Sequence, residues 1–290
     1  MKDSTSLSVD IRGLQYHCRT WGDAASPTLF MLHGYQDVSA SWQFTVDAMQ
    51  RDWYIVAPDW RGYGLSAWSG SDTYYFPDLV ADLDALLDHF EPETPATLIG
   101  HSMGANTAAI YAGVIPGRIH KFVNVEGIGG PPSLPDEAPR RYARWLQQIA
   151  RGEQQRPYES FADFADRMMA ENPHLTRERA DFLVRHWGKE EPDGTVVRRA
   201  DPAQSFIRPT SSRVDEMLAC WRRITAPTLW VEGTQSRNIT NLMGQPEGYE
   251  ERLMALQTLT GVERIDNAGH NIHHDQPEQL AEVIERFLAS

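Results

Sequence analysis

The sequence predicts an α/β protein with a doubly wound, mostly parallel sheet and a helical subdomain inserted into it. Two patterns carry this prediction. First, short and uniformly apolar segments, typical of strands buried on both faces of a parallel sheet, alternate along the chain with segments of helical periodicity. Such an order places helices on both faces of the sheet. Second, the alternation stops after Glu126 for about ninety residues, a size suited to an inserted subdomain, and then resumes.

The first half of the chain supplies most of the expected core strands. Residues 5–20 alternate polar and apolar side chains around an Arg-Gly turn, which predicts an opening hairpin. The uniformly apolar segments follow at Thr28–Leu32, Trp53–Ala57, Ala96–Ile99 and Phe122–Val125. Between these segments we expect one helix with an apolar stripe from Leu79 to Phe90, and a second, alanine-rich helix after Gly104.

The expected insertion starts with a cluster of residues that break helices and strands. Residues 127–135 read GIGGPPSLP. Helical stretches follow near 136–151, 158–171 and 175–188, and no strand–helix alternation accompanies them. Their apolar residues, Met168 and Trp187 among them, are expected mainly to pack the insertion, with a subset facing the site as an apolar pocket. Arg198 could meet an acidic substrate, although exposed, solvated charge is the commoner role.

The alternation resumes in the last quarter of the chain. The expected elements are a strand at Pro227–Val231, a helix near 248–259, a short strand at Val262–Ile265, and a final helix with one apolar stripe. We therefore divide the chain into an α/β core, residues 1–130 and 216–290, and a helical cap, residues 131–215.

The charge balance excludes two classes of partner. The 290 residues include 27 Lys plus Arg against 40 Asp plus Glu, which gives a formal net charge of −13. Phosphate backbones and anionic lipid would repel such a chain, and no basic run offsets its charge. No apolar stretch reaches the roughly 18 residues of a membrane-spanning helix. We expect neither a nucleic-acid partner nor a membrane partner.

The N-terminal residues and the cysteines indicate the cellular compartment. The N-terminal residues MKDSTSLSVD are polar and lack the apolar region of a secretory signal. Cys18 and Cys220 lie far apart and fit unpaired thiols in a reducing compartment. We expect a cytoplasmic protein, monomeric or homodimeric, that is large enough to bury a core without disulfides.

The sharpest local signal is Gly100-His101-Ser102-Met103-Gly104, between an apolar strand and the alanine-rich helix. A serine on a tight strand-to-helix turn needs flanking glycines, because larger side chains would clash with the neighbouring backbone. The turn projects the hydroxyl above the sheet edge, and the helix N-terminus behind it favours an anion. The pattern predicts Ser102 as a nucleophile; the alternative is an ordinary turn with a capping serine.

A second motif, His33-Gly34-Tyr35, follows the strand at Thr28–Leu32. An oxyanion hole needs two backbone N–H groups aimed at one point. Met103, directly after the serine, is expected to supply one of them, and Tyr35 the other. Without the other motifs, these three residues would indicate only a glycine-containing loop.

A third motif is the Ala-Gly-His sequence that ends at His270, after the last short strand. A serine hydroxyl is a weak nucleophile at neutral pH and needs a base of pKa near the working pH, which suits histidine. His273, His274 and Asp275 follow, so a metal site built from this H-x-x-H-H-D cluster is the alternative. We expect no metal, because the helical spacing of two histidines with a glutamate is absent.

Four ordered motifs together resemble those of the α/β-hydrolase fold family. They are HGY at 33–35, PDWRGYG at 58–64, GHSMG at 100–104 and AGH at 268–270. The resemblance spans residues 9–288, and the cap is its least diagnostic part. It implies that Ser102 is the nucleophile, His270 the base, and Tyr35 and Met103 the oxyanion donors, with no cofactor.

The acid of the triad departs from the commoner family pattern. Many members place an Asp three residues after a Gly, just past the strand that follows the cap, but LWVEGTQSR puts Ser236 there. Other members place the acid after the strand that precedes the cap, where FVNVEGIGG offers Glu126. We favour Glu126, because the end of a neighbouring strand can reach the histidine. Glu232 is the competitor, and a missing acid is the remaining alternative.

The resemblance also bears on the reaction. Haloalkane dehalogenases and epoxide hydrolases of this superfamily use a carboxylate nucleophile, whereas a serine with a histidine base fits acyl transfer through an acyl-enzyme. We therefore expect a serine hydrolase that acts on a carboxylic ester of a small or medium apolar substrate. A carbon–carbon bond hydrolase, a lactonase or a thioesterase would use the same triad. A ligand-binding receptor on this fold would keep the site without turnover.

Overall fold

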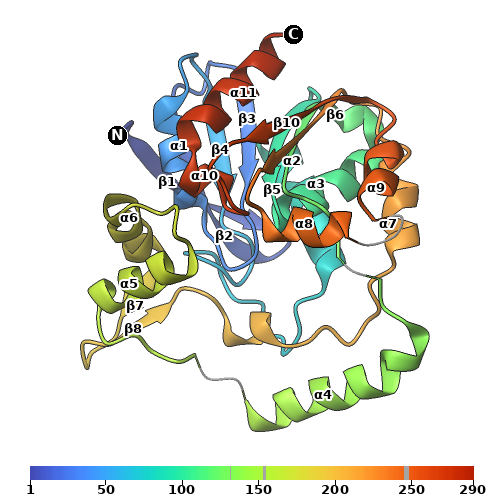
Figure 1. Ribbon diagram of the computed structural model, residues 1–290. Helices are drawn as coiled ribbons and strands as arrows, with labels where there is room; N and C mark the ends of the chain where they lie inside the picture. Colours follow the sequence, from blue (N-terminus) through green and yellow to red (C-terminus); the bar gives the residue numbers. More distant parts are fainter. Residues whose placement is uncertain (131, 153–154, 245–247) are drawn as a thin grey trace.

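The computed structural model describes residues 1–130, 132–152, 155–244 and 248–290 (Figure 1). Among these residues, eight strands form one sheet in the order β1–β2–β4–β3–β5–β6–β9–β10. Their bounds are β1 Ser4–Ile11, β2 Leu14–Trp21, β3 Thr28–Leu32, β4 Tyr54–Pro58, β5 Ala96–His101, β6 Ile119–Val125, β9 Thr228–Gly233 and β10 Leu259–Ile265.

Parallel pairing dominates this sheet. β1 with β2 and β2 with β4 are antiparallel, and every other neighbouring pair is parallel. The carboxyl ends of β3, β5, β6, β9 and β10 therefore meet at one edge, which is where open α/β sheets carry their sites. The predicted fold class is confirmed.

Helices cover both faces of the sheet (Figure 1). On one face lie α1 Gln43–Ala48, α10 Ile272–Asp275 and α11 Pro277–Ala289; on the other lie α2 Phe76–Phe90, α3 Met103–Val114, α7 Val214–Trp221, α8 Arg237–Met243 and α9 Tyr249–Ala255. Strand β3 shows how one segment serves both cores. Phe30 and Leu32 belong to the apolar cluster under α2 and α3, and Leu29 and Met31 to the cluster under α1 and α11. Successive side chains of a strand point to opposite faces, so a strand between two helical layers must be apolar throughout.

The segment between β6 and β9 has an apolar cluster of its own. It contains α4 Ala138–Arg151, α5 Phe161–Glu171, α6 Arg177–Trp187, β7 Gly188–Glu190 and β8 Val196–Arg198. Phe164, Leu183 and Val196 are buried in a cluster formed by α5, α6 and β8. Helix α4 carries no fully buried residue and lies apart from α5 and α6 in Figure 1. Helix α7, at the end of this segment, packs on α3 of the core.

Most of the elements expected from the sequence are present, with shifted ends. The helices expected near 158–171 and 175–188 begin at Phe161 and Arg177, because the Ser160 and Thr176 hydroxyls cap them. The hairpin β7–β8 and the short helices α1, α7, α8 and α10 were not expected. The hairpin follows from a Pro-Asp-Gly turn in which Gly194 has a φ of +84°. Four 3₁₀ helices complete the described elements: η1 Ser39–Trp42, η2 Pro116–Arg118, η3 Pro135–Glu137 and η4 Pro202–Ser205.

In the described part of the chain, no helix combines the length and apolar character that crossing a membrane requires.

Candidate active site

Ser102 occupies a sharp turn between strand β5 and helix α3. Its φ of +50° and ψ of −112° are uncommon for any residue other than glycine. Two hydrogen bonds hold this conformation: the Ser102 N–H donates to the Val125 carbonyl at 2.9 Å, and its carbonyl accepts from the Asn106 N–H at 2.9 Å. Strained backbone of this kind persists only where its surroundings determine it, and it clusters at functional sites.

The two glycines around Ser102 leave no room for a side chain. A Cβ on Gly100 would lie 2.5 Å from the Ala105 Cα, and a Cβ on Gly104 would lie 2.3 Å from the Leu32 carbonyl oxygen. Both obstacles are backbone atoms, which cannot rotate away. The glycines thus allow strand β5, helix α3 and the end of β3 to approach closely, as the sequence motif predicts.

His270 lies beside Ser102, in the loop that follows β10. The Ser102 Oγ and the His270 Nε2 are 3.0 Å apart, a distance at which the hydroxyl donates to the imidazole. A hydrogen bond from the protein interior holds this loop, because the His101 Nε2 donates to the His270 carbonyl at 2.9 Å. The imidazole stays partly exposed, with 29% of its side chain accessible. A solvent-facing edge of this kind leaves access for a substrate.

Glu126 completes a hydrogen-bonded chain of three side chains. The His270 Nδ1 donates to the Glu126 Oε2 at 3.1 Å. The same carboxylate accepts from the Gly233 N–H at 2.8 Å and from the Ser236 hydroxyl at 2.7 Å. Glu126 is only 1% exposed, and a buried carboxylate of this kind needs such donors. The sequence favoured this residue as the triad acid, and the structure brings it to the histidine.

The competitor, Glu232, points elsewhere. Its carboxylate accepts from the Trp230 Nε1 at 2.9 Å, the Tyr249 hydroxyl at 2.8 Å and the Arg264 Nε at 2.8 Å. All three partners lie on β9, β10 or α9, away from His270. Its hydrogen bond to Trp230, two residues earlier in β9, shows that these two side chains share one face of the strand.

Ser236 has a place at the site that the sequence reasoning did not foresee. It was considered only as the position where many relatives carry the acid. In the structure its hydroxyl donates to Glu126 and accepts from the Ile239 N–H at 3.4 Å, where helix α8 starts. A serine at this position therefore supports an acid that is supplied by another strand.

The proposed oxyanion donors belong to segments that adjoin Ser102. Met103 is the first residue of α3, so its N–H is among those that an α-helix leaves unpaired at its start. The loop of Tyr35 is packed against the serine, since a Cβ on Gly34 would lie 3.2 Å from the Ser102 Cβ. This loop is held by His33, whose Nδ1 donates to the Gly34 carbonyl at 2.8 Å and whose Nε2 accepts from the Trp60 N–H at 2.9 Å.

The site opens into a pocket of about 430 Å³, which is within the range of small-molecule sites. The core and the inserted segment both line it. From the core come Tyr35, Asp37, His101, Ser102, His270 and His274, and from the insertion Met168, Glu171, Asn172, Leu175, Trp187 and Arg198. A subset of the apolar cap residues therefore does face the site, and Arg198 lies there too.

Three further imidazoles lie in a row with that of His270. The ring centroids of His270 and His101 are 4.8 Å apart, those of His101 and His273 4.4 Å, and those of His273 and His274 4.0 Å. Burial lowers the pKa of His101 well below its usual value and lowers the pKa of His274 to about 3. These two rings are neutral at physiological pH and add no positive charge beside the base.

The H-x-x-H-H-D cluster considered from the sequence is divided between different contacts. His270 turns to Ser102, whereas the His273 Nε2 contacts the Asp37 Oδ2 at 2.9 Å. Asp275 accepts from the Gly269 N–H at 2.8 Å and from the Asn172 Nδ2 at 2.7 Å. Asp37 was missed from the sequence, because it lies in the loop after β3 and no local pattern marks it.

The sequence matches the alpha/beta hydrolase family over residues 29–283. The chain belongs to this family. Membership agrees with the resemblance found from the four motifs, and it makes the protein a hydrolase.

Curated relatives and solved structures cover almost the whole chain. A serine hydrolase-like protein of Danio rerio is 25% identical over 281 residues, covering 93% of this chain and 84% of the relative. Epoxide hydrolase A of Mycobacterium tuberculosis is 32% identical over 330 residues, covering 98% of this chain and 97% of the relative. A thioesterase domain from the curacin biosynthetic pathway superposes with a TM-score of 0.85 at 24% identity, covering 98% of this chain and 99% of that one.

The tight turn at Ser102 can be tested with two glycine variants. Gly104→Ala would place a Cβ 2.3 Å from the Leu32 carbonyl oxygen, whereas nothing lies within 4 Å of a Cβ on Gly117. We expect Gly104→Ala to lower the free energy of unfolding by about 1–3 kcal/mol through overpacking, although alanine is the better helix former. Gly117→Ala should change it by less than about 0.5 kcal/mol. Urea unfolding measures both, and a fully stable Gly104→Ala protein would contradict the close approach.

Proposed function

We propose that the protein is a serine hydrolase that cleaves carboxylic esters through an acyl-enzyme, without a cofactor. The observation that carries this proposal is the chain of hydrogen bonds from Ser102 through His270 to Glu126, at 3.0 and 3.1 Å. This arrangement joins a nucleophile to a base, and the base to a group that orients it.

In the proposed mechanism, the Ser102 Oγ attacks the carbonyl carbon of the ester while the His270 Nε2 takes up the hydroxyl proton. The buried carboxylate of Glu126 holds the Nδ1–H and stabilises the imidazolium that forms. The Met103 and Tyr35 N–H groups bind the oxyanion of the tetrahedral intermediate. The intermediate collapses as His270 returns the proton to the leaving alcohol. Water, deprotonated by the same imidazole, then attacks the acyl-enzyme, and His270 returns this proton to the Ser102 Oγ as the acid is released.

The nucleophile supports acyl transfer over epoxide opening. Epoxide hydrolases of this superfamily use a carboxylate nucleophile, which forms an alkyl ester, and this chain carries Ser102 at that position. A carbon–carbon bond, a lactone or a thioester would be cleaved by the same three groups, so a substrate screen separates these alternatives from the ester. A non-catalytic receptor is disfavoured, because a binding site has no need of the aligned Ser102, His270 and Glu126.

We further propose that residues 131–215 act as a cap that shapes the acyl pocket. The support is that Met168, Leu175 and Trp187 line the pocket that contains Ser102. The cluster around Phe164 is separate from the two core clusters, and within it helices α5 and α6 pack on each other. Apolar lining from the cap suits an acyl chain of small or medium length.

The nucleophile is tested by Ser102→Ala. Removing the attacking hydroxyl of a triad costs on the order of 10⁶-fold in turnover, so we expect hydrolysis of p-nitrophenyl esters to vanish while the fold is kept. Labelling by a fluorophosphonate should disappear as well, because the activated serine hydroxyl is the group that attacks the phosphorus of the probe and displaces fluoride. Retention of more than a few per cent of the rate by a correctly folded variant would show that another group attacks. Failure of the wild-type protein to label would favour the receptor.

The acid is tested by Glu126→Gln beside Glu232→Gln. The first change keeps the shape but removes the charge that stabilises the imidazolium, and the analogous change in a triad costs around 10⁴-fold in turnover. Glu232→Gln should stay within about tenfold, equivalent to about 1.4 kcal/mol, and so should Ser236→Ala. Steady-state kinetics on one activated ester compares all of these variants.

A rescue variant sharpens the same test. The Ser236 hydroxyl lies 2.7 Å from the Glu126 carboxylate, so Ser236→Asp in the Glu126→Gln background should place a charge near His270 and recover part of the rate. A near-normal rate in Glu126→Gln alone would refute the assignment. A large loss confined to Glu232→Gln would move the acid to β9.

The cap is tested by Met168→Ala, with Met254→Ala as its matched control. Met168 lines the pocket, whereas Met254 is 72% exposed on α9. A shorter side chain at position 168 should enlarge the pocket and favour longer acyl chains. Each methylene of the substrate that gains or loses a contact changes kcat/KM by about tenfold or more. The ratio of kcat/KM for p-nitrophenyl octanoate to that for the butyrate should rise in Met168→Ala and stay constant in Met254→Ala. Identical chain-length profiles in both variants would contradict a cap-lined pocket.

A further inference from the structure

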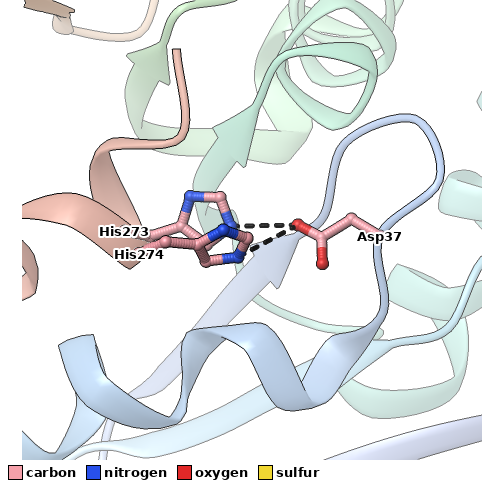
Figure 2. Close-up of side chains that lie close together, drawn as sticks. All are labelled: Asp37, His273 and His274. Carbon is pink, nitrogen blue, oxygen red and sulfur yellow. Dashed lines mark hydrogen bonds and ion pairs between the residues drawn. The ribbon is translucent and has the colours of Figure 1, made fainter. Parts of the chain in front are cut away.

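Asp37, His273 and His274 form a buried cluster beside the catalytic pocket. Figure 2 shows both imidazoles turned toward the carboxylate of Asp37. The Asp37 Oδ2 lies 2.9 Å from the His273 Nε2 and 3.9 Å from the His274 Nε2. One ligand atom from each residue falls within 4.8 Å of the other two. The three residues are 3%, 0% and 1% exposed.

The hydrogen bonds of this cluster do not satisfy the Nε2 of His274. At 3.9 Å its Nε2 is too far from Asp37 for a hydrogen bond, and within the described residues this buried nitrogen, like the His273 Nδ1, has no hydrogen-bond partner. An unpaired polar atom in the interior costs about 1–3 kcal/mol. A group that binds the lone pair of this nitrogen would remove that cost.

The donor set matches a particular class of ion. Two imidazole nitrogens and one carboxylate oxygen suit Zn²⁺ and its transition-metal neighbours, whereas Mg²⁺ and Ca²⁺ prefer oxygen ligands. Ligands at roughly 2.0–2.2 Å around a tetrahedral ion stand about 3.3–3.6 Å apart. The two carboxylate–imidazole separations of 2.9 and 3.9 Å bracket that value, and the ligand atoms of the two histidines lie within 4.8 Å of one another. Side-chain movements can therefore bring Asp37 and both histidines to one ion.

The surroundings of Asp37 fix its orientation, as outer partners do for metal ligands. Its Oδ1 accepts from the Val38 N–H at 2.7 Å and from the Ser41 hydroxyl. The Ser41 Oγ accepts in turn from the Trp187 Nε1 at 2.9 Å. Trp42 lies against the His273 ring, with centroids 4.8 Å apart. The carboxylate and one imidazole are therefore held in place before any ion binds.

We propose that Asp37, His273 and His274 bind one divalent transition-metal ion in the wall of the catalytic pocket, and that the ion inhibits hydrolysis. Asp37 and His274 line the pocket that contains Ser102 and His270, so a fourth coordination position faces that pocket. Coordination through the His273 Nε2 uses the lone pair of that nitrogen, so the ring then carries its N–H at Nδ1. No covalent or redox step is involved.

Inhibition follows from the charge of the ion. A single imidazole, His101, lies between His273 and His270, with centroid separations of 4.4 and 4.8 Å. A divalent cation at that distance opposes the positive charge that His270 acquires when it takes the serine proton. This part of the proposal rests on the proposed serine-hydrolase function, whereas binding of the metal does not.

Metal binding is tested by titrating Zn²⁺ into chelator-treated protein in a calorimeter. The wild-type protein should bind one ion at micromolar concentration or below. His274→Gln removes one ligand and should weaken binding on the order of 100-fold. His120→Gln, which changes an exposed histidine on β6, should bind as the wild type does. Ser102→Ala should also bind normally, because the serine is not a ligand.

A second measurement guards against a variant that merely misfolds. In the wild-type protein Co²⁺ should give visible absorption that Zn²⁺ displaces, and Zn²⁺ should raise the Tm. Folded His274→Gln should show neither effect at the same metal concentration. No saturable binding by the wild type up to about 100 µM Zn²⁺ would overturn the proposal. The proposal would also be overturned if the wild type and His274→Gln bound Zn²⁺ with equal affinity. Loss of Zn²⁺ binding in His270→Ala with normal binding in His274→Gln would overturn it too.

The inhibitory role is measured separately, as the ratio of rates with and without Zn²⁺ within each protein. Wild-type ester hydrolysis should fall at least tenfold at saturating Zn²⁺ and recover with EDTA, and the fall should require about 100-fold more metal in His274→Gln. Zinc that binds at this site without changing the rate would refute inhibition. A wild-type protein without ester hydrolysis would refute the proposed function, and the calorimetry would still decide the metal site.

Discussion

The buried carboxylate of Glu126 is the contact on which the geometry of the candidate site depends. It joins the loops that follow three parallel strands, because it accepts hydrogen bonds from the Gly233 N–H, the Ser236 hydroxyl and the His270 Nδ1. The Glu126 N–H also donates to the Val231 carbonyl at 3.0 Å, which fixes the backbone at a φ of +56°. A buried charge without these donors would cost several kcal/mol, so the three loops are held at one spacing.

Much of this arrangement could be predicted from the sequence, because local rules determine it. The apolar segments had to be buried strands, and the glycines around Ser102 had to mark a tight turn, since only glycine fits against the Leu32 carbonyl. Glu126 could be favoured over Glu232 because it stands at the end of a strand, where the sheet turns into a loop. A residue within β9 is committed to one face of the sheet, and Glu232 is bound there by Trp230, Tyr249 and Arg264.

The contacts that could not be predicted are those that the tertiary fold alone creates. Asp37 meets His273 across 236 residues of chain, and neither residue carries a local signal for the other. The Trp187 Nε1 at the end of α6 donates to the Ser41 hydroxyl, which in turn donates to Asp37. Periodicity and turn chemistry describe neighbours in sequence, so a polar network assembled from distant loops lies beyond them. The same reasoning explains why the role of Ser236, as a donor to an acid on another strand, was missed.

The row of imidazoles gives the site an electrostatic asymmetry. In the proposed mechanism His270 takes up the serine proton, and its imidazolium would then lie between the carboxylate of Glu126 and the neutral ring of His101. Burial keeps the pKa of His101 well below its usual value, so that ring does not compete for the proton or repel the charge. Asp37, at the other end of the row of histidines, adds a second negative charge. Because Asp37 is buried, solvent and salt screen this charge only weakly. A cation at the proposed metal site would oppose the field that this arrangement applies to His270, so metal binding and proton uptake by His270 would be coupled electrostatically although the two sites share no ligand.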